Sequence, residues 1–276
     1  MSTTIVSAAE LAAHPEWRVI DCSHAITDPN AGATAYASEH IPGAVHARME
    51  AVLSGARTGG NGRNPLPRPQ DFARWLGEVG IAPTDQVVAY DRSGNAAAAR
   101  LWWMLRWIGH EAAAVLDGGF AAWTGAGLPV TNAVSNPRSV TYEPRANSGM
   151  HVDIAFMESR FGDPGVLVVD ARTRERFHGI GETTDPRGGH IPRSISRPHT
   201  ANVDASGLFK SPDLLASEWQ SLIGEMRREA LVMSCGSGVS ACHNLLSLEI
   251  AGIGGAVLYP GSWSEWCSDE SRPIEV

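Results

Sequence analysis

A cysteine at the start of a glycine-rich loop carries the clearest chemical signal in this chain. Residues 231–240 read Leu-Val-Met-Ser-Cys-Gly-Ser-Gly-Val-Ser, which predicts a buried strand, a tight loop and the first turn of a helix. Loop N–H groups and the positive end of a helix dipole both stabilise a thiolate relative to a thiol. Because the thiolate is the nucleophilic form, we expect Cys235 to be a nucleophile rather than a packed structural thiol.

The other three cysteines lie far apart and form no Cys-x-x-Cys pair, so the sequence predicts neither a zinc site nor a disulfide framework. Cys22 directly follows a predicted core strand, and Cys242 falls on the apolar face of a predicted helix. We therefore expect both of them, like Cys267, to be buried and unreactive.

The composition is that of a globular protein with room for one large or two medium domains. The chain has 276 residues, of which 43% are hydrophobic and 19% charged, and its net charge is -8. The negative charge disfavours nucleic acid and anionic membranes as partners. No apolar run approaches the roughly 18–20 residues of a membrane span, and the N-terminus has no signal-peptide pattern, so a cytoplasmic protein is expected.

The two halves of the chain repeat the same motifs in the same order. A β-rich run ending in Asp21 is followed 19 residues later by His-Ile-Pro at His40, and a similar run ending in Asp170 is followed 20 residues later by His-Ile-Pro at His190. We interpret the chain as an N-terminal domain (1–130), a linker (131–150) rich in Pro, Asn, Ser and Arg, and a C-terminal catalytic domain (151–276).

Within each copy, short β-branched runs alternate with helical patterns. This alternation predicts an α/β fold in which a mainly parallel sheet is flanked by helices on both faces. Ligands of such sheets bind at the carboxyl ends of the strands, where Cys235 is expected. The clearest predicted helices cover residues 69–76, 100–108, 211–222 and 240–251.

The repeat indicates which copy performs chemistry. Asp91 stands in the first copy where Cys235 stands in the second. A carboxylate cannot take up and pass on a sulfur atom, so we expect both copies to fold alike and only the C-terminal copy to be catalytic.

The motifs identify a family. They are the two His-Ile-Pro elements, Asp-Gly-Gly-Phe-x-x-Trp from Asp117, Gly-Ser-Trp-Ser-Glu-Trp from Gly261, and the Cys235 loop. In these motifs the whole chain resembles the tandem-domain rhodanese-like sulfurtransferases. The resemblance implies two rhodanese-like domains and a persulfide on Cys235. It implies that sulfur passes from a small donor to a thiol, cyanide or a thioredoxin-like dithiol, without a metal or organic cofactor.

The loop sequence favours one donor. Cys-Gly-Ser-Gly-Val-Ser is similar to the Cys-Gly-Ser-Gly-Val-Thr of 3-mercaptopyruvate enzymes, whereas thiosulfate enzymes typically carry Cys-Arg-Lys-Gly-Val-Thr. A neutral Ser237 can hydrogen-bond the ketone of mercaptopyruvate or the enolate left when sulfur departs, whereas an Arg-Lys pair would bind dianionic thiosulfate. The remaining loop positions are expected to contact the donor: Gly236, Gly238, Val239 and Ser240. Thiosulfate remains the alternative donor.

A donor carboxylate needs cations, and arginines crowd the segment after Asp170. The resemblance assigns substrate binding to Arg176 and Arg187. Arginine suits this role because its planar fork pairs with both carboxylate oxygens.

The chain also departs from the family pattern. Glu50 falls where the first domain usually supplies an aspartate to a proton relay, and Asn64 falls where a histidine is expected. Glutamate can act as a base, but asparagine cannot transfer protons at neutral pH. Arg193 replaces a glycine, and either a contribution to the site potential or a surface position fits it. His40 and His190 are expected to be structural, each tying its loop to the strand-end acid.

Two other functions compete with catalytic sulfur transfer. A cysteine phosphatase on a related fold needs Cys-x5-Arg, but Ala241 stands six residues after Cys235. A persulfide carrier with little turnover of its own fits the Glu50 and Asn64 departures.

Overall fold

The computed structural model describes residues 2–276 and divides them into two compact units. Unit 1 comprises residues 2–55, 66–147 and 206–208, and unit 2 comprises residues 56–65, 148–205 and 209–276. Within residues 2–276, no helix combines the length and the apolar character needed to cross a membrane.

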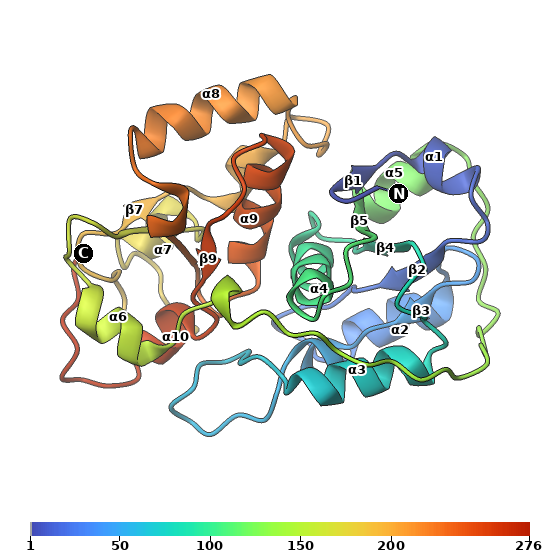
Figure 1. Cartoon of the computed structure of the whole chain (residues 1–276), viewed down its shortest axis with the longest axis horizontal. Helices are drawn as coiled ribbons and strands as arrows, with labels where there is room; N and C mark the ends of the chain where they lie inside the picture. The colour runs from blue at the N-terminus through green and yellow to red at the C-terminus, as the bar shows by residue number, and fades with distance from the viewer. Residues whose placement is uncertain (1) are drawn as a thin grey trace. The chain divides into compact units, whose positions relative to one another are not determined.

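Unit 1 is built on a parallel sheet with strand order β1-β5-β4-β2-β3 (Figure 1). Its strands are β1 (Ile5–Val6), β2 (Arg18–Asp21), β3 (Val45–His46), β4 (Val87–Tyr90) and β5 (Ala113–Leu116). Its helices are α1 (Ala8–Ala12), α2 (Ala31–Ser38), the single turn η1 (Met49–Leu53), α3 (Pro69–Glu78), α4 (Ala96–Trp107) and α5 (Gly119–Gly125).

Helices cover both faces of this sheet. Leu11 of α1 and Trp123 of α5 share one apolar cluster with Val19, Val88 and Ala114 of the strands. The helix α4 packs against β4 and β5 with most of its side chains buried. Because β4 is covered on both sides, all four of its residues are buried, as expected for a central parallel strand.

Unit 2 repeats this plan on a parallel sheet with strand order β7-β6-β8-β9. Its strands are β6 (Leu167–Asp170), β7 (Ile195–Ser196), β8 (Leu231–Ser234) and β9 (Val257–Leu258). Its longer helices are α6 (Ile154–Arg160), α7 (Arg174–Phe177), α8 (Pro212–Ile223), α9 (Ser240–Ile250) and α10 (Ser262–Trp266). Short 3-10 turns complete it: η2 (Ser148–Met150), η3 (His199–Asn202) and η4 (Arg228–Ala230).

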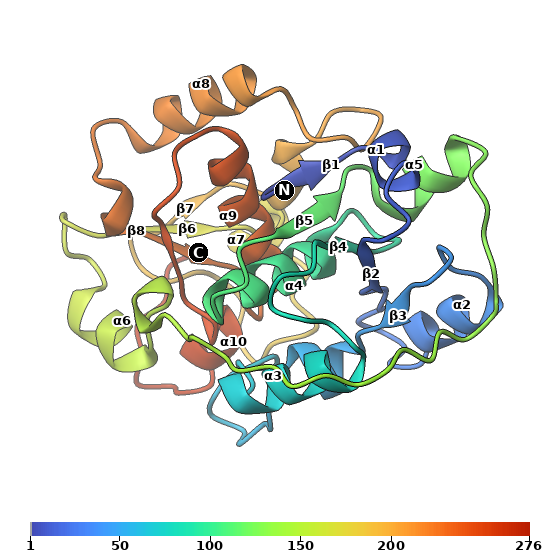
Figure 2. The same cartoon turned by 45° about the vertical axis from the view of Figure 1, so that its right-hand side comes forward.

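The helices of unit 2 also form two layers. Met157 of α6 and Trp263 and Trp266 of α10 cluster with Val168 and Val232 of the sheet. The helix α9 packs against β8 and carries α8 on its other side, as Figure 2 shows. The predicted α/β architecture, with a parallel sheet between helices in each copy, is confirmed.

Local signals placed the helix starts well. The helix α3 begins at Pro69 and α8 at Pro212, where the Ser211 side chain caps the first turn, and α9 begins at Ser240. The helix α4 begins at Ala96, four residues before the predicted start. The cause is Asp91, whose carboxylate accepts the N–H groups of Ala97 and Ala98 and so caps this end of the helix.

Two segments belong to units that differ from the predicted domain boundaries. Residues up to 147, most of the predicted linker, belong to unit 1, where main-chain N–H groups of Val140 and Arg145 donate to carbonyls of Gly77 and Ile108. Residues 56–65, which the prediction assigned to the N-terminal domain, cluster with unit 2. This second segment carries Arg63 and Asn64.

Candidate active site

The Cys235 loop lies at the carboxyl end of β8, as predicted. Cys235 is 1% exposed, and its Sγ accepts the Gly238 N–H at 3.1 Å. Gly238 has φ +75°, the left-handed region that favours glycine. Val239 is buried just before α9, and half-buried Ser240 is the first residue of that helix. The thiol therefore lies against the Gly238 N–H, two residues before the start of α9, and a helix N-terminus favours negative charge.

Neighbouring residues fix the loop from its other side. The Ser262 hydroxyl accepts the Cys235 N–H at 3.1 Å, and the Trp263 N–H donates to the Cys235 carbonyl at 2.9 Å. A Cβ on Gly238 would lie 2.4 Å from the carbonyl oxygen of Pro260, so no larger residue fits there without movement. Ser262 itself has φ +54°, a strained value for a residue with a side chain.

The equivalent loop of unit 1 demonstrates what this backbone binds. The buried Asp91 carboxylate accepts four main-chain N–H groups, from Ser93 at 2.8 Å, Asn95 at 2.8 Å, Ala97 at 2.9 Å and Ala98 at 3.1 Å. A strand–loop–helix of this kind therefore surrounds a negative charge with N–H donors. In unit 2 the residue at that position is Cys235.

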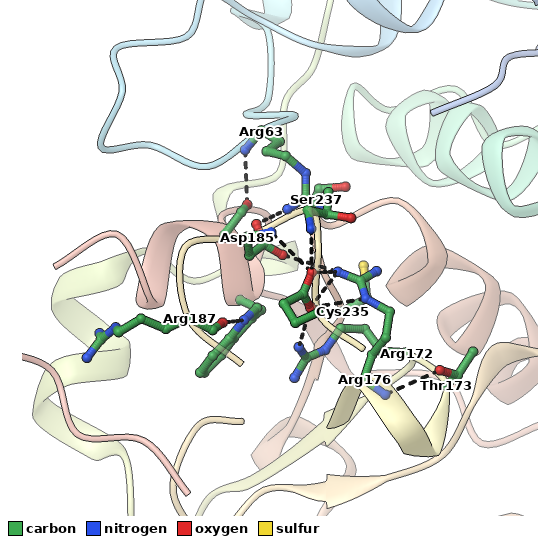
Figure 3. A network of polar contacts seen from close by, with 12 residues as sticks. Arg63, Arg172, Thr173, Arg176, Asp185, Arg187, Cys235 and Ser237 are labelled. Carbon is green, nitrogen blue, oxygen red and sulfur yellow. Dashed lines mark hydrogen bonds and ion pairs between the residues drawn. The ribbon is translucent and has the colours of Figure 1, made fainter. Parts of the chain in front are cut away.

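Three arginines gather at the Cys235 loop (Figure 3). A Cβ on Gly236 would lie 2.9 Å from Nη2 of Arg63, 3.6 Å from Nη1 of Arg176 and 3.8 Å from Cδ of Arg172. Arg176 was predicted from the family resemblance, and its α7 position is set by the Thr173 side chain that caps this helix. The guanidinium groups of Arg63 and Arg176 therefore lie beside the Cys235 loop, where they are suited to binding an anion.

Each of these arginines is paired with a buried carboxylate. Arg172 binds Asp170 through Nε at 2.9 Å and Nη2 at 2.7 Å, and Arg176 binds Glu182 through Nε at 3.1 Å and Nη2 at 2.9 Å. Asp185 forms ion pairs with both Arg63 and Arg176. Burial lowers the pKa of Arg63, and the positive charge of Arg176 lowers it further.

Asn64 and Glu50, the two residues expected at the positions of the proton relay, lie in different units. Asn64 reaches the loop, where its Nδ2 donates to the Ser237 hydroxyl at 2.9 Å, and Ser237 is half-buried. Glu50 lies in η1 of unit 1 and its side chain is exposed. The structure therefore brings Asn64 and Ser237 together.

Arg187 does not join the arginine group. Its guanidinium donates to the carbonyl oxygens of Cys267 at 3.2 Å and Asp269 at 2.6 Å, with longer bonds to Glu270 and Arg272. In Figure 3 its side chain extends away from Cys235. The carbonyls that follow the end of α10 take up its donors in this structure, and substrate binding by Arg187 stays a prediction.

The two repeated histidines are structural, but their partners differ from the expected strand-end acids. His40 Nδ1 donates to the Tyr36 carbonyl at 2.7 Å, and His190 Nδ1 donates to the Phe177 carbonyl at 2.9 Å. Arg193 is exposed, has φ +62°, and donates through Nη1 to the Gly162 carbonyl at 2.8 Å. Of the two positions left open for Arg193, the structure favours the surface.

Sequence reasoning missed four residues of this site: Arg63, Arg172, Asp185 and Ser262. Arg172 had an available signal, because it follows the strand-end Asp170 by two residues and its main-chain N–H donates to that carboxylate. The other three depend on segments that are distant in the sequence from Cys235.

Comparison with known proteins agrees with this geometry. The rhodanese-like domain matches residues 5–126 and 154–269. The chain is 41% identical to a probable 3-mercaptopyruvate sulfurtransferase of Pseudomonas aeruginosa, over 99% of this chain and 98% of the relative. It is 34% identical to a putative thiosulfate sulfurtransferase, SseB, of Mycobacterium tuberculosis, over 98% and 96%. A solved 3-mercaptopyruvate sulfurtransferase from Leishmania major superposes with a TM-score of 0.85 at 28% identity, covering 96% of this chain and 74% of that one.

Proposed function

The chain belongs to the rhodanese-like family and is a sulfurtransferase, and we propose that it carries sulfur from 3-mercaptopyruvate through a Cys235 persulfide to a thiol or cyanide. One observation carries this proposal. Cys235 occupies the loop position at which the other copy binds a carboxylate with four N–H groups. Donors of that kind suit a thiolate before sulfur transfer and a persulfide anion after it.

In the first step, the Cys235 thiolate attacks the sulfur of mercaptopyruvate. A sulfur–sulfur bond forms and the carbon–sulfur bond breaks, so its electron pair leaves as the enolate of pyruvate. The proton that the donor sulfur carried ends on the enolate carbon, which gives pyruvate and a Cys235 persulfide anion. The Ser237 hydroxyl, positioned by Asn64, can donate to the ketone oxygen as negative charge develops there.

In the second step, an acceptor attacks the outer sulfur of the persulfide. Cyanide leaves as thiocyanate and regenerates the Cys235 thiolate, whereas a thiol becomes a persulfide. We propose a small thiol or a thioredoxin-like dithiol as the acceptor. Both steps move only sulfur, protons and electron pairs, so the proposal requires no metal or organic cofactor.

The neutral loop supports mercaptopyruvate as the donor. Gly236 and Ser237 add no charge beside Cys235, and Arg176 at the loop is suited to the donor carboxylate. Thiosulfate is the second candidate, because the chain is also 34% identical to a relative named as a putative thiosulfate sulfurtransferase. We propose the cytoplasm as the location, since a reducing compartment would keep the free thiol of Cys235 reactive.

Intact-mass spectrometry tests the proposal directly. The protein is incubated with each donor, and a gain of one sulfur atom is expected with mercaptopyruvate. Cys235→Ser should abolish the gain, whereas the matched variant Cys22→Ser, which replaces a buried thiol of unit 1, should retain it. No sulfur gain from any donor would refute the sulfur-transfer chemistry.

A single-turnover measurement then separates the enzyme from a carrier module. The loaded protein is mixed with cyanide or a small thiol, and release of the outer sulfur is followed over time. Release at a rate that matches steady-state turnover is expected for an enzyme. Negligible release to every small acceptor would favour the carrier.

A further inference from the structure

The charges around the Cys235 loop cancel. Guanidinium nitrogens of Arg63 and Arg176 lie near Gly236, and the Cδ of Arg172 lies there too. These arginines are paired with three carboxylates whose side chains are almost wholly buried, Asp170 at 4%, Glu182 at 3% and Asp185 at 2% exposed. Because these acids are shielded from water, their charges act on a bound donor with little screening.

The pairing leaves particular guanidinium atoms for a ligand. Arg172 Nη1 is buried and has no hydrogen-bond partner among the described residues, since its nearest carboxylate oxygen, on Glu182, is 3.9 Å away. Arg176 contacts Glu182 and Asp185 through Nε and Nη2, which leaves Nη1 on the side of Gly236. The site therefore offers N–H donors but no net positive charge.

We propose that Asp185 determines donor selectivity, by neutralising the arginines so that the site accepts a singly charged donor and disfavours a dianion. The inference rests on the proposed function and concerns the same site. Asp185 is the acid to single out because it bridges Arg63 and Arg176, the two guanidinium groups closest to Gly236.

The physical argument compares the two donors. Mercaptopyruvate brings one carboxylate charge, which the free N–H donors can bind. Thiosulfate brings two charges, and both are repelled by the buried acids. Because the cost of removing an ion from water rises steeply with its charge, a neutral cluster compensates a dianion less well than a monoanion.

The test is Asp185→Asn, which keeps the shape of the side chain and removes its charge. Initial rates are measured with cyanide as acceptor and each donor in turn. The ratio of kcat/KM for thiosulfate to kcat/KM for mercaptopyruvate should rise by about tenfold. This is the expected effect of removing one negative charge that repels the second charge of thiosulfate. Asp185→Glu keeps the charge and should keep the ratio of the unchanged protein.

Asp163→Asn is the matched control. Asp163 belongs to the same unit, is partly exposed and pairs with Arg160 at 2.9 Å, so its replacement changes the net charge equally but outside the arginine cluster. An Asp185→Asn ratio that moves no more than that of the control would overturn the inference. So would an Asp185→Glu variant that behaves like Asp185→Asn.

A pair of inhibitors extends the test to the unchanged protein. Methanesulfonate and sulfate have similar tetrahedral shapes but carry one and two negative charges. Methanesulfonate should compete with mercaptopyruvate at least as strongly as sulfate, and tighter inhibition by sulfate would refute the inference even if Asp185→Asn did not fold. Failure of the proposed function has a different signature, namely no sulfur uptake from either donor.

Discussion

Replacing Gly238 by alanine should slow sulfur uptake at Cys235 while unit 2 remains folded. The added Cβ would meet the Pro260 carbonyl oxygen at 2.4 Å and two further backbone atoms of Pro260 at 3.0 Å. Backbone atoms cannot turn aside as a flexible side chain can, so the loop or Pro260 must shift.

The size of the effect follows from the contacts of the loop. Alanine at φ +75° costs about 1–2 kcal/mol of folding free energy whatever the surroundings. The shift also displaces the Gly238 N–H from the Cys235 Sγ, now 3.1 Å away. A hydrogen bond to a charged group contributes about 1.5–3 kcal/mol, so its loss from the thiolate predicts a roughly 10- to 150-fold slower sulfur uptake.

The assay is the rate of sulfur gain at Cys235, followed by intact mass after rapid mixing with mercaptopyruvate. The matched control is Gly252→Ala, since Gly252 has φ +72° in the same unit and no atom lies within 4 Å of its added Cβ. The control should lose similar stability from backbone strain but keep the rate of uptake. Equal rates for Gly238→Ala and Gly252→Ala would refute the reasoning.

Three further predictions concern the surroundings of the loop. Burial lowers the pKa of His243 to about 3, so between about pH 3 and 6.5 this imidazole binds a proton in the unfolded chain but not in the folded one. The free energy of unfolding should therefore fall by about 2 kcal/mol from pH 7 to pH 5. Urea unfolding of His243→Leu should lack this part of the pH dependence. Ser262→Ala leaves the buried Cys235 N–H unpaired and should cost about 1–3 kcal/mol in the urea unfolding of unit 2, a result that a fully stable variant would contradict. Arg187→Ala should lower the midpoint temperature of thermal unfolding while KM for mercaptopyruvate stays within about twofold. A large rise in KM would show instead that Arg187 binds the substrate.

The parts of the molecule that sequence patterns predicted are those set by local interactions. The Cys235 loop is an example, because an apolar strand, two glycines and a helix start follow one another without interruption. The structural equivalence of the Asp91 and Cys235 loops is confirmed for the same reason, since each residue lies between a strand and a helix of its own copy. Proline and serine signals placed both ends of α8 within one residue.

The parts that the sequence could not predict depend on distant segments. Arg63 lies beside the loop because residues 56–65 pack with unit 2. No local sequence pattern predicts that this segment leaves the unit of its neighbours in the sequence. Arg187 matched a family position, but the direction of its side chain is decided by carbonyls that follow α10. The role proposed for Asp185 depends on its ion pairs with Arg63 and Arg176, which no sequence pattern indicates.

The membership of residues 56–65 in unit 2 determines how much of the chain the Cys235 site requires. The segment that carries Arg63 and Asn64 lies within the first repeat of the sequence, whereas Cys235 lies in the second. A gene shortened to residues 148–276 would keep Cys235 but lose both of these side chains. The site at Cys235 therefore needs segments from both repeats of the chain, although Cys235 itself stands in only one of them.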